Sequence, residues 1–557
     1  MNASAQIERS DVISTDDVIL AIEGLNVSLP AGMDRDHAVR DIGVELRRGE
    51  ILCVIGESGS GKSVMSHAVM GLLPPQLKPV AGRIVFDGRD LLTEPPEALR
   101  DLRGRAISMI FQDPLSALNP LMTVGDQIAG VMRAHGVGTA QTRRARALEL
   151  VREVGLPDPE LMLLQYPFRL SGGQRQRVMI AMALALEPQI LIADEPTTAL
   201  DVTTQAQILE LIRDIQRRKG MSVLFVTHDF GVVSEIADRV LVMEKGHLVE
   251  AGTVQKVLTR PEHPYTQRLV AAVPRMRGDT REGMQGTPVV LKVENLRKVY
   301  RSGGGFLSKE RRVVAVDDVS FELRKGRTLG VVGESGSGKS SLGKLLMKLI
   351  DCDGGRIILN GADVAAMPEA AFRPYRKTIQ MVFQDPFASL NPRHTIGRIL
   401  TAGPVTYGET PGVARAAARR YLDMVGLSAS AFDRYPHEFS GGQRQRIGIA
   451  RALMFDPQVI VADEAISALD VSIQAQILKL FADVQAETKV GLVFITHDLR
   501  VASQICDEVL VMHKGRVVES GPPAQIFLSP GDDYTRRLVA AIPGAEITLS
   551  HDGSPQP

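Results

Sequence analysis

Two stretches of the chain carry the same eight residues, whose types suit them to holding a polyphosphate. Both read Gly-Glu-Ser-Gly-Ser-Gly-Lys-Ser, each follows a short apolar run typical of a buried strand, and each precedes a segment of helical pattern. The glycines let backbone N–H groups surround phosphate oxygens, and the start of a helix adds partial positive charge. The residues are Gly56, Glu57, Ser58, Gly59, Ser60, Gly61, Lys62 and Ser63, and Gly333, Glu334, Ser335, Gly336, Ser337, Gly338, Lys339 and Ser340.

The context of these stretches predicts P-loops. Lys62 and Lys339 are expected to reach the β- and γ-phosphates of a nucleotide, and the hydroxyls of Ser63 and Ser340 to ligate Mg²⁺. The alternative for one stretch alone is a Gly/Ser-rich turn without a ligand. An identical repeat in the same context, with Lys339 lying 277 residues after Lys62, argues strongly against that alternative.

An Asp-Glu pair follows a buried apolar run in each half of the chain. A carboxylate at a strand end beside a P-loop can hold the Mg²⁺ that bridges the phosphates, so we predict this role for Asp194 and Asp463. The next residues, Glu195 and Glu464, are placed to act as general bases on the attacking water. In isolation, an Asp-Glu pair that merely ends a strand would be an equal alternative.

A glutamine and a histidine also recur at predicted strand ends. Gln112 and Gln384 each stand in Phe-Gln-Asp-Pro, where a neutral amide can ligate Mg²⁺ or the attacking water. His228 and His497 each stand in Thr-His-Asp, where an imidazole can donate to the γ-phosphate and hold the water. A single histidine at a strand end is more often structural, but its duplication favours the functional reading.

A second predicted phosphate-binding element is the sequence Ser-Gly-Gly-Gln-Arg-Gln-Arg, identical in both halves. Two glycines before a helix expose N–H groups at its positive end, and the serine adds a hydroxyl. An ordinary helix capped by the serine is the alternative. The residues are Ser171, Gly172, Gly173 and Gln174, and Ser440, Gly441, Gly442 and Gln443.

Composition limits the class of protein. A chain of 557 residues is too long for one hydrophobic core, and 44% hydrophobic residues suffice for two. A net charge of zero lacks the global basic footprint of a nucleic-acid binder. The three cysteines stand singly, which favours a reducing compartment and argues against zinc. The polar, acidic start does not resemble a signal peptide, and we find no apolar run long enough to span a membrane.

The repeats divide the chain into two similar domains. We predict a disordered tail over residues 1–17, a first domain over 18–273, a linker over 274–288, a second domain over 289–543 and a tail over 544–557. In the first domain, residues 18–29 and 38–46 read as paired strands. Residues 64–73 and 175–186 read as helices, residues 116–170 as an inserted helical subdomain, and residues 240–250 as a hairpin.

These motifs together resemble the ATP-binding-cassette (ABC) ATPases over nearly the whole chain. The resemblance implies an α/β fold of two tandem nucleotide-binding domains, each a P-loop core with an antiparallel β subdomain and an inserted helical subdomain. It also implies that each ATP lies between the P-loop set of one half and the Ser-Gly-Gly-Gln sequence of the other. Asp201 and Asp470, in Ala-Leu-Asp, match the family's D-loop, which links the two sites.

Finer features narrow the resemblance. Residues 175–184 and 193–202 look like the first ATPase of dipeptide and oligopeptide importers, and residues 440–453 look like the second. Each half ends in a family-like tail, at residues 263–269 and 533–538. The resemblance implies two integral-membrane permeases and a periplasmic or lipid-anchored solute-binding protein as partners. It also implies a peripheral place on the cytoplasmic face of a bacterial inner membrane, ATP and Mg²⁺ as cofactors, and no nucleic acid.

The two halves depart from the family pattern at three points. Tyr300 occupies the position of the family's adenine-stacking aromatic, whereas the first half has Leu29 there. Ala465 replaces the proline that follows the catalytic glutamate of the first half, Pro196, and is expected to loosen that loop. Some relatives hold an iron–sulfur cluster on clustered cysteines, but Cys506 stands alone.

Three other functions are weighed against import. ABC proteins of translation or DNA repair usually carry a long charged linker, a coiled coil or zinc cysteines, and the sequence has none of these. A purely regulatory ATP sensor is disfavoured by the intact Glu195 and Glu464. Efflux remains an alternative, although the motif details favour import. The sequence does not identify the cargo.

Overall fold

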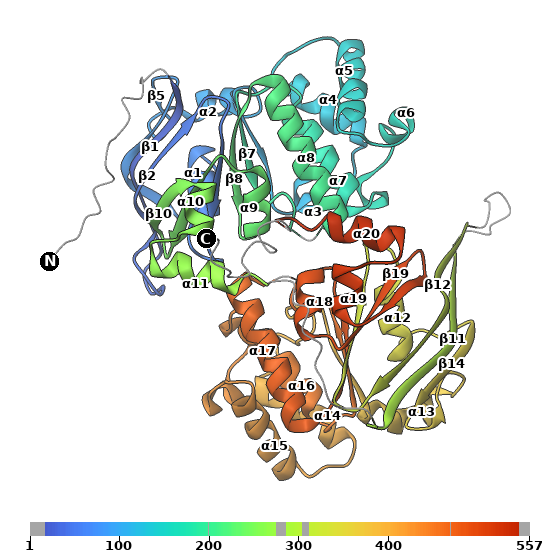
Figure 1. Cartoon of the computed structure of the whole chain (residues 1–557). Helices are drawn as coiled ribbons and strands as arrows, with labels where there is room; N and C mark the ends of the chain where they lie inside the picture. Colours follow the sequence, from blue (N-terminus) through green and yellow to red (C-terminus); the bar gives the residue numbers. More distant parts are fainter. Residues whose placement is uncertain (1–16, 199, 275–285, 303–310, 468, 545–557) are drawn as a thin grey trace, which may run out of the picture. The chain divides into compact units, whose positions relative to one another are not determined.

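The computed structural model describes residues 17–198, 200–274, 286–302, 311–467 and 469–544. It divides into two compact units, residues 1–198 with 207–271, and residues 199–206 with 272–557. Most of the predicted N-terminal tail and C-terminal tail, and the middle of the predicted linker, lie outside the described residues. Each unit contains one six-stranded and one four-stranded sheet (Figure 1).

The smaller sheet of the first unit is antiparallel, in the order β2-β1-β4-β5. It consists of β1 (Val18–Ser28), β2 (His37–Arg47), β4 (Lys78–Phe86) and β5 (Arg89–Asp90). Strand β1 pairs with β2 as predicted, and residues such as Leu20 and Ile22 alternate onto the buried face. This layer carries the first of the two adenine-side positions predicted from the sequence.

The larger sheet of the first unit is parallel apart from its edge strand β10, in the order β10-β9-β3-β8-β7-β6. Its strands are β3 (Ile51–Ile55), β6 (Ile107–Ile110), β7 (Ile190–Asp194), β8 (Ser222–Thr227), β9 (Arg239–Glu244) and β10 (His247–Thr253). Parallel strands place their carboxyl ends at one edge, so the segments after β3, β6, β7 and β8 converge there. All the predicted catalytic side chains of this half lie in those segments.

Helices surround and extend this sheet. Helices α1 (Lys62–Val69), α8 (Val202–Lys219) and α9 (Phe230–Ile236) follow strands of this sheet, whereas α2 (Pro96–Leu102) follows β5 of the smaller sheet. Helices α10 (Val254–Thr259) and α11 (Pro264–Ala272) come last in the unit. The insertion between β6 and β7 contains α3 (Pro114–Ala117), α4 (Val124–Ala134), α5 (Ala140–Glu153), α6 (Pro159–Met162) and α7 (Gly172–Ala183) (Figure 1). The predicted helical subdomain is therefore confirmed.

The second unit repeats this plan. Its antiparallel sheet runs β12-β11-β14-β15, and its larger sheet runs β16-β17-β18-β13-β19-β20 with only β20 antiparallel. The strands are β11 (Val289–Ser302), β12 (Arg311–Arg324), β13 (Thr328–Val332), β14 (Gly354–Leu359), β15 (Ala362–Asp363), β16 (Ile379–Val382), β17 (Val459–Asp463), β18 (Gly491–Ile495), β19 (Glu508–His513) and β20 (Arg516–Gly521). The helices are α12 (Lys339–Leu346), α13 (Glu369–Phe372), α14 (Ile396–Thr406), α15 (Pro411–Met424), α16 (Gly441–Leu453), α17 (Val471–Thr488), α18 (Leu499–Ile505), α19 (Pro523–Leu528) and α20 (Asp533–Ala540).

Two helix boundaries differ from the prediction. Helix α1 begins at Lys62 and ends at Val69, four residues before the predicted end, because Gly71 turns the chain with φ 59°. Helix α7 begins at Gly172, because Ser171 caps its first turn, and it ends at Ala183. Among the described residues, no helix combines the length and apolarity needed to cross a bilayer.

Candidate active sites

The P-loop of the first unit is shaped by glycines that no larger residue can replace. A Cβ on Gly56 would lie 2.2 Å from the Met243 carbonyl oxygen, and one on Gly61 would lie 2.7 Å from that of Ala38. Gly61, with φ 103°, caps helix α1, so the loop leads directly into a helix N-terminus. Because these glycines lack a Cβ, the backbone can form a cradle of the kind that surrounds phosphate.

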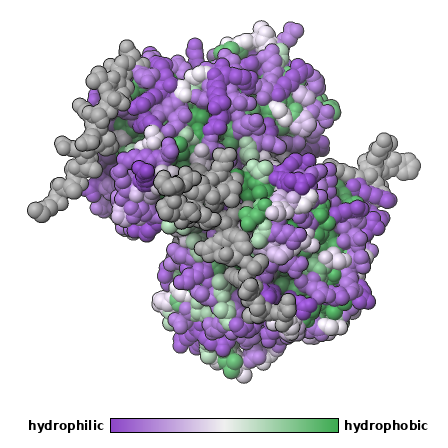
Figure 2. Space-filling model, in the orientation of Figure 1, coloured by the Kyte–Doolittle hydropathy of each residue, from purple (hydrophilic) through white to green (hydrophobic). Residues whose placement is uncertain are grey.

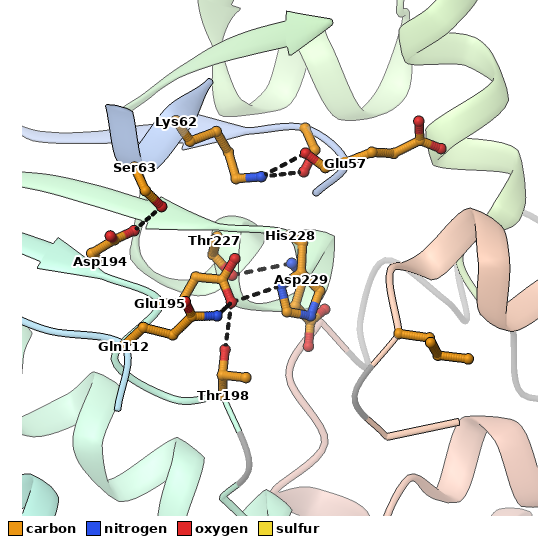
Figure 3. A network of polar contacts seen from close by, with 12 residues as sticks. Glu57, Lys62, Ser63, Gln112, Asp194, Glu195, Thr198, Thr227, His228 and Asp229 are labelled. Carbon is orange, nitrogen blue, oxygen red and sulfur yellow. Dashed lines mark hydrogen bonds and ion pairs between the residues drawn. The ribbon is translucent and has the colours of Figure 1, made fainter. Parts of the chain in front are cut away.

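The side chain of Lys62, the first residue of α1, reaches back to the loop (Figure 3). Its Nζ donates to the carbonyl oxygens of Gly56 at 2.7 Å and Glu57 at 2.9 Å, and the residue is buried. The second unit repeats the arrangement, with Lys339 Nζ donating to Gly333 at 2.7 Å and Glu334 at 2.8 Å. Burial lowers the pKa of Lys339, although carboxylates led by Glu464 act in the opposite direction.

A hydroxyl and a carboxylate meet beside each lysine. Ser63 Oγ donates to Asp194 Oδ1 at 3.1 Å, and Ser340 Oγ donates to Asp463 Oδ1 at 3.5 Å (Figure 3 shows the first pair). Burial raises the pKa of both aspartates, and the charge of the neighbouring glutamate, Glu195 or Glu464, adds to the rise in each. Hard oxygen ligands gathered at a phosphate cradle fit a bound Mg²⁺.

The carboxylate of Glu195 is the centre of a polar network in the first unit (Figure 3). Its Oε2 accepts hydrogen bonds from Gln112 Nε2 at 2.9 Å and Thr198 Oγ1 at 2.9 Å, and His228 Nδ1 lies 3.3 Å away. Burial alone would raise the pKa of Glu195, but the His228 hydrogen bond and the charges of His228 and Lys62 outweigh it and lower the pKa to about 2. The carboxylate is therefore ionised near neutral pH.

Glu464 occupies the corresponding place in the second unit. Gln384 Nε2 donates to its Oε2 at 2.7 Å, and His497 Nδ1 lies 3.6 Å away. Burial again opposes ionisation, and the His497 hydrogen bond and charge lower the pKa of Glu464 below its ordinary value. Both glutamates adopt a left-handed backbone, with φ 48° and 45°. The backbone therefore adopts the same left-handed conformation at this residue whether Pro196 or Ala465 follows, and the looser loop expected from Ala465 stays a prediction.

The Ser-Gly-Gly-Gln residues begin helices α7 and α16. Ser171 Oγ accepts from the Gln174 N–H at 3.3 Å while Gln174 Oε1 accepts from the Ser171 N–H at 3.0 Å, and Ser440 and Gln443 form the same reciprocal cap. The capped-helix alternative thus describes the local structure correctly. At the start of α7 the residues Ser171 and Gly172 are exposed, so an anion can approach this helix N-terminus.

Tyr300 lies in strand β11, and Leu29 directly follows strand β1 at the corresponding point of the first unit. Ser28 pairs with His37 immediately before Leu29, and Val299 pairs with Val314 immediately before Tyr300. Tyr300 is 40% exposed and so available to stack on a ligand, whereas Leu29 is partly buried against the core. Asp201, the first predicted D-loop aspartate, accepts from the Thr204 N–H at 3.0 Å at the start of α8.

Sequence reasoning missed three polar side chains near these sites. Thr198 contacts the Glu195 carboxylate, and Tyr265 and Tyr534 contact the second residue of each P-loop. Thr198 lies within the family-like residues 193–202, but nothing in that motif indicates that its hydroxyl reaches the Glu195 carboxylate. The tyrosines stand in the recurring tail segments, and that recurrence was the available signal.

A parallel sheet with a P-loop, an Asp-Glu pair, a glutamine and a histidine at its carboxyl edge, present twice, defines a tandem P-loop ATPase. The family model "ABC transporter" matches residues 39–198 and 316–467, and "Oligopeptide/dipeptide transporter, C-terminal region" matches residues 249–300. The chain belongs to the ABC transporter family as a two-cassette ATP-binding ATPase. The predicted fold class and family resemblance are confirmed.

The chain is similar over nearly its whole length to two-cassette relatives. It is 47% identical to the "Peptidoglycan transport ATP-binding protein YejF" of Agrobacterium fabrum, over 94% of this chain and 96% of the relative. It is 45% identical to the "Glutathione import ATP-binding protein GsiA" of Escherichia coli K12, over 95% of this chain and 90% of the relative.

Proposed function

We propose that the chain is the energy-coupling ATPase of a bacterial ABC importer for a peptide-like solute, such as a di- or oligopeptide, glutathione or a peptidoglycan fragment. The observation that carries the proposal is that the predicted catalytic side chains meet in both halves, with Gln112 on Glu195 and Gln384 on Glu464, in a chain that also matches an oligopeptide-transporter C-terminal region. The names of the relatives support import of such solutes.

The chemistry proposed for each site is attack of water on the γ-phosphate of ATP, which breaks the bond from the γ-phosphorus to the bridging oxygen and releases ADP and phosphate. Glu195 and Glu464 take the proton of that water, and Gln112, Gln384, His228 and His497 orient the water and the phosphate. A carboxylate with a pKa of about 2, as at Glu195, is a weak base. The negative charge of a bound triphosphate raises the pKa of a neighbouring carboxylate, so substrate binding itself would make Glu195 more basic.

The residues that would hold Mg²⁺ are Ser63, Gln112 and Asp194 in the first set and Ser340, Gln384 and Asp463 in the second. The ion would supply charge neutralisation on the β- and γ-phosphate oxygens. The 3.1 Å approach of the Ser63 hydroxyl to the Asp194 carboxylate supports this assignment, because both oxygens lie beside the phosphate cradle.

On the family resemblance, we further propose that each ATP is shared between the halves. Site one would use the Lys62 set with Ser440–Gln443 of the second half, and site two the Lys339 set with the corresponding serine-to-glutamine run of the first half. Asp201 and Asp470 would link the two. If this is correct, Ser440→Glu will impair ATP hydrolysis by a chain whose Lys339 site is disabled, and Ser171→Glu will not. Equal effects of the two variants would contradict the pairing.

The proposed partners are two membrane permeases and a periplasmic or lipid-anchored solute-binding protein, with the chain on the cytoplasmic face of the inner membrane. Exposed apolar side chains in the helical insertion of the first unit support a protein partner there. They are Leu115, Leu121, Leu161, Leu164 and Phe168, with Leu121 85% exposed. Much of the surface seen in Figure 2 is hydrophilic, so exposed apolar side chains of this size are exceptions.

The test is reconstitution. The chain, the candidate permeases and the solute-binding protein are placed in liposomes, and uptake of labelled glutathione and dipeptides is measured with and without ATP. ATP-dependent uptake that is lost in the Lys62→Ala, Lys339→Ala double variant is the expected result. ATP hydrolysis that responds neither to the permeases nor to the binding protein would overturn the import proposal.

A further inference from the structure

The C-terminal segment of each cassette reaches back to the P-loop through a single tyrosine. Tyr265, on helix α11, accepts a hydrogen bond through its hydroxyl oxygen from the Glu57 N–H at 3.0 Å. Tyr534, on helix α20, accepts one from the Glu334 N–H at 3.1 Å. Both tyrosines are buried, and each bond joins residues about two hundred positions apart in the chain, 208 and 200 respectively.

We propose that Tyr265 and Tyr534 are positioning residues for the two P-loops, and that they couple the order of the C-terminal segments to nucleotide binding. The inference rests on the P-loops binding ATP. It assigns a role to the segments that follow the catalytic core, which no catalytic residue occupies.

Each tyrosine is held by a loop of hydrogen bonds, and each unit has its own equivalent loop. In the first, the Glu250 carboxylate accepts from the N–H groups of Glu262 at 2.9 Å and His263 at 3.1 Å, and His263 Nδ1 accepts from the Tyr265 N–H at 3.3 Å. A chain of contacts therefore runs from strand β10 through the start of α11 to the P-loop.

The second unit forms an equivalent series of hydrogen bonds with different residues. The Glu519 carboxylate accepts from the N–H groups of Gly531 at 2.8 Å and Asp532 at 3.2 Å, and Asp532 accepts from the Tyr534 N–H at 2.8 Å. Aspartate thus does what His263 does in the first unit. That two different capping residues present the same phenol to the same loop position argues that the phenol contact is what the segment delivers.

The contact falls on a residue whose other backbone group serves the phosphate-binding lysine. The Glu57 carbonyl accepts from Lys62 Nζ at 2.9 Å, so the residue is held at its N–H by Tyr265 and at its oxygen by Lys62. A bound phosphate competes for Lys62 Nζ, because the ammonium group has a limited number of protons to donate. The tyrosine bond then remains to fix residue 57 while the loop encloses the phosphate.

Thermodynamic linkage makes the coupling reciprocal. If the segment holds the P-loop in its binding conformation, nucleotide binding must in turn stabilise the segment. This consequence separates a positioning role from mere satisfaction of a partly buried N–H group, which would contribute to folding but would not respond to nucleotide.

The first experiment uses the full-length chain with Lys339→Ala, so that only the Lys62 site is read. Binding of a fluorescent ATP analogue is titrated for this parent and for Tyr265→Phe, which removes only the hydroxyl. Loss of one hydrogen bond predicts affinity weaker by about 3- to 10-fold. Tyr375→Phe is the matched control, since it removes a phenol hydroxyl elsewhere, and Tyr534→Phe in a Lys62→Ala chain tests the other half.

The second experiment reads the linkage directly. Amide hydrogen exchange of residues 264–272 is expected to slow when ATP is added to the parent, and to respond much less in Tyr265→Phe. A double-mutant cycle with Glu250→Gln tests whether Glu250 acts through Tyr265. If it does, Glu250→Gln is expected to weaken nucleotide binding only while Tyr265 is present.

The outcomes are distinguishable. A parent that does not bind the nucleotide overturns the proposed function together with this inference. A parent that binds, with Tyr265→Phe binding equally well and showing the same exchange response, overturns this inference alone. Weaker binding in Tyr265→Phe with an unchanged exchange response at residues 264–272 also overturns the coupling.

Discussion

The two cassettes share one plan but differ at the carboxylate expected to activate water. In the first, Thr198 Oγ1 donates to the Glu195 carboxylate at 2.9 Å. In the second, the corresponding Ser467 donates instead to the Glu464 backbone carbonyl at 3.0 Å. The Glu195 carboxylate therefore carries one more hydrogen-bond donor, which favours its ionised form and weakens it as a base.

The positions predicted to lie beside adenine also differ between the two cassettes. Tyr300 offers an exposed ring to the second cassette, and Leu29 offers a half-buried aliphatic side chain to the first. We infer that the site containing Lys339 binds ATP more tightly and has the stronger base, whereas the site containing Lys62 is weaker on both counts. Duplicated motifs therefore need not mean equal sites.

The largest expected effect tests whether both sites are catalytic at all. Glu195→Gln and Glu464→Gln each remove a proposed general base, and a general base is worth on the order of 10²- to 10⁴-fold in rate. With permeases present, we expect either single variant to collapse ATP hydrolysis if the sites are coupled. Tolerance of Glu195→Gln alone would make the first site regulatory. If neither variant matters, the assigned bases are wrong.

The next largest expected effect is the change of the free energy of unfolding with pH. Because the pKa of Glu195 is lowered from 4.5 to about 2 in the folded chain, its ionisation stabilises the fold above about pH 4.5, and this stabilisation is lost as the pH falls towards 2. The shift corresponds to about 3 kcal/mol. In urea unfolding without nucleotide, the stability difference between the wild-type chain and Glu195→Gln should shrink between pH 6 and pH 3.

The control for this titration is Glu464→Gln. In the wild-type chain the Glu464 carboxylate has no counterpart of the Thr198 donor, because Ser467 donates to the Glu464 backbone carbonyl instead. We expect its stability difference to change less over the same pH range. A difference for Glu195→Gln that stays constant with pH would show that the carboxylate is not held in its ionised form by the network.

Removing the ring of Tyr300 and placing one at Leu29 should invert the difference in ATP affinity between the two sites. Stacking of a base on an aromatic ring is worth about 1–3 kcal/mol by alanine substitution. Tyr300→Ala is therefore expected to weaken ATP binding at the Lys339 site by roughly 10-fold or more. Leu29→Tyr is expected to strengthen the Lys62 site. Each is measured by nucleotide titration in a chain whose other P-loop lysine is replaced, and unchanged affinity in both would refute the inferred difference.

The smallest expected effect concerns the threonine itself. Thr198→Val keeps the shape but removes the donor, so the pKa of Glu195 should rise, and one hydrogen bond changes the balance by only about 1 kcal/mol. The acid limb of the pH–rate profile of the Lys62 site should move to higher pH. Ser467→Thr is the reciprocal variant and should shift the Lys339 site the opposite way if its hydroxyl turns to the carboxylate.

Much of the fold and the candidate site was predictable because the signals are local. A P-loop joins a strand to a helix within a dozen residues, and Asp194, Gln112 and His228 each end or follow an apolar run of buried-strand type. Carboxyl ends of parallel strands lie at one edge, so residues distant in sequence were expected together, and Gln112 does meet Glu195 at 2.9 Å. The catalytic roles of these residues stay predictions.

The sequence by itself therefore determined the two P-loop domains, their family and the residue types gathered at each sheet edge, because repetition and periodicity are readable without a structure. Only the tertiary structure decided which oxygen Thr198 and Ser467 reach, where helices α1 and α7 begin and end, and that Tyr265 meets the P-loop from 208 residues away. The reason is physical: a hydrogen bond depends on ångström-scale loop geometry and on how distant segments pack, and neither is encoded in local spacing.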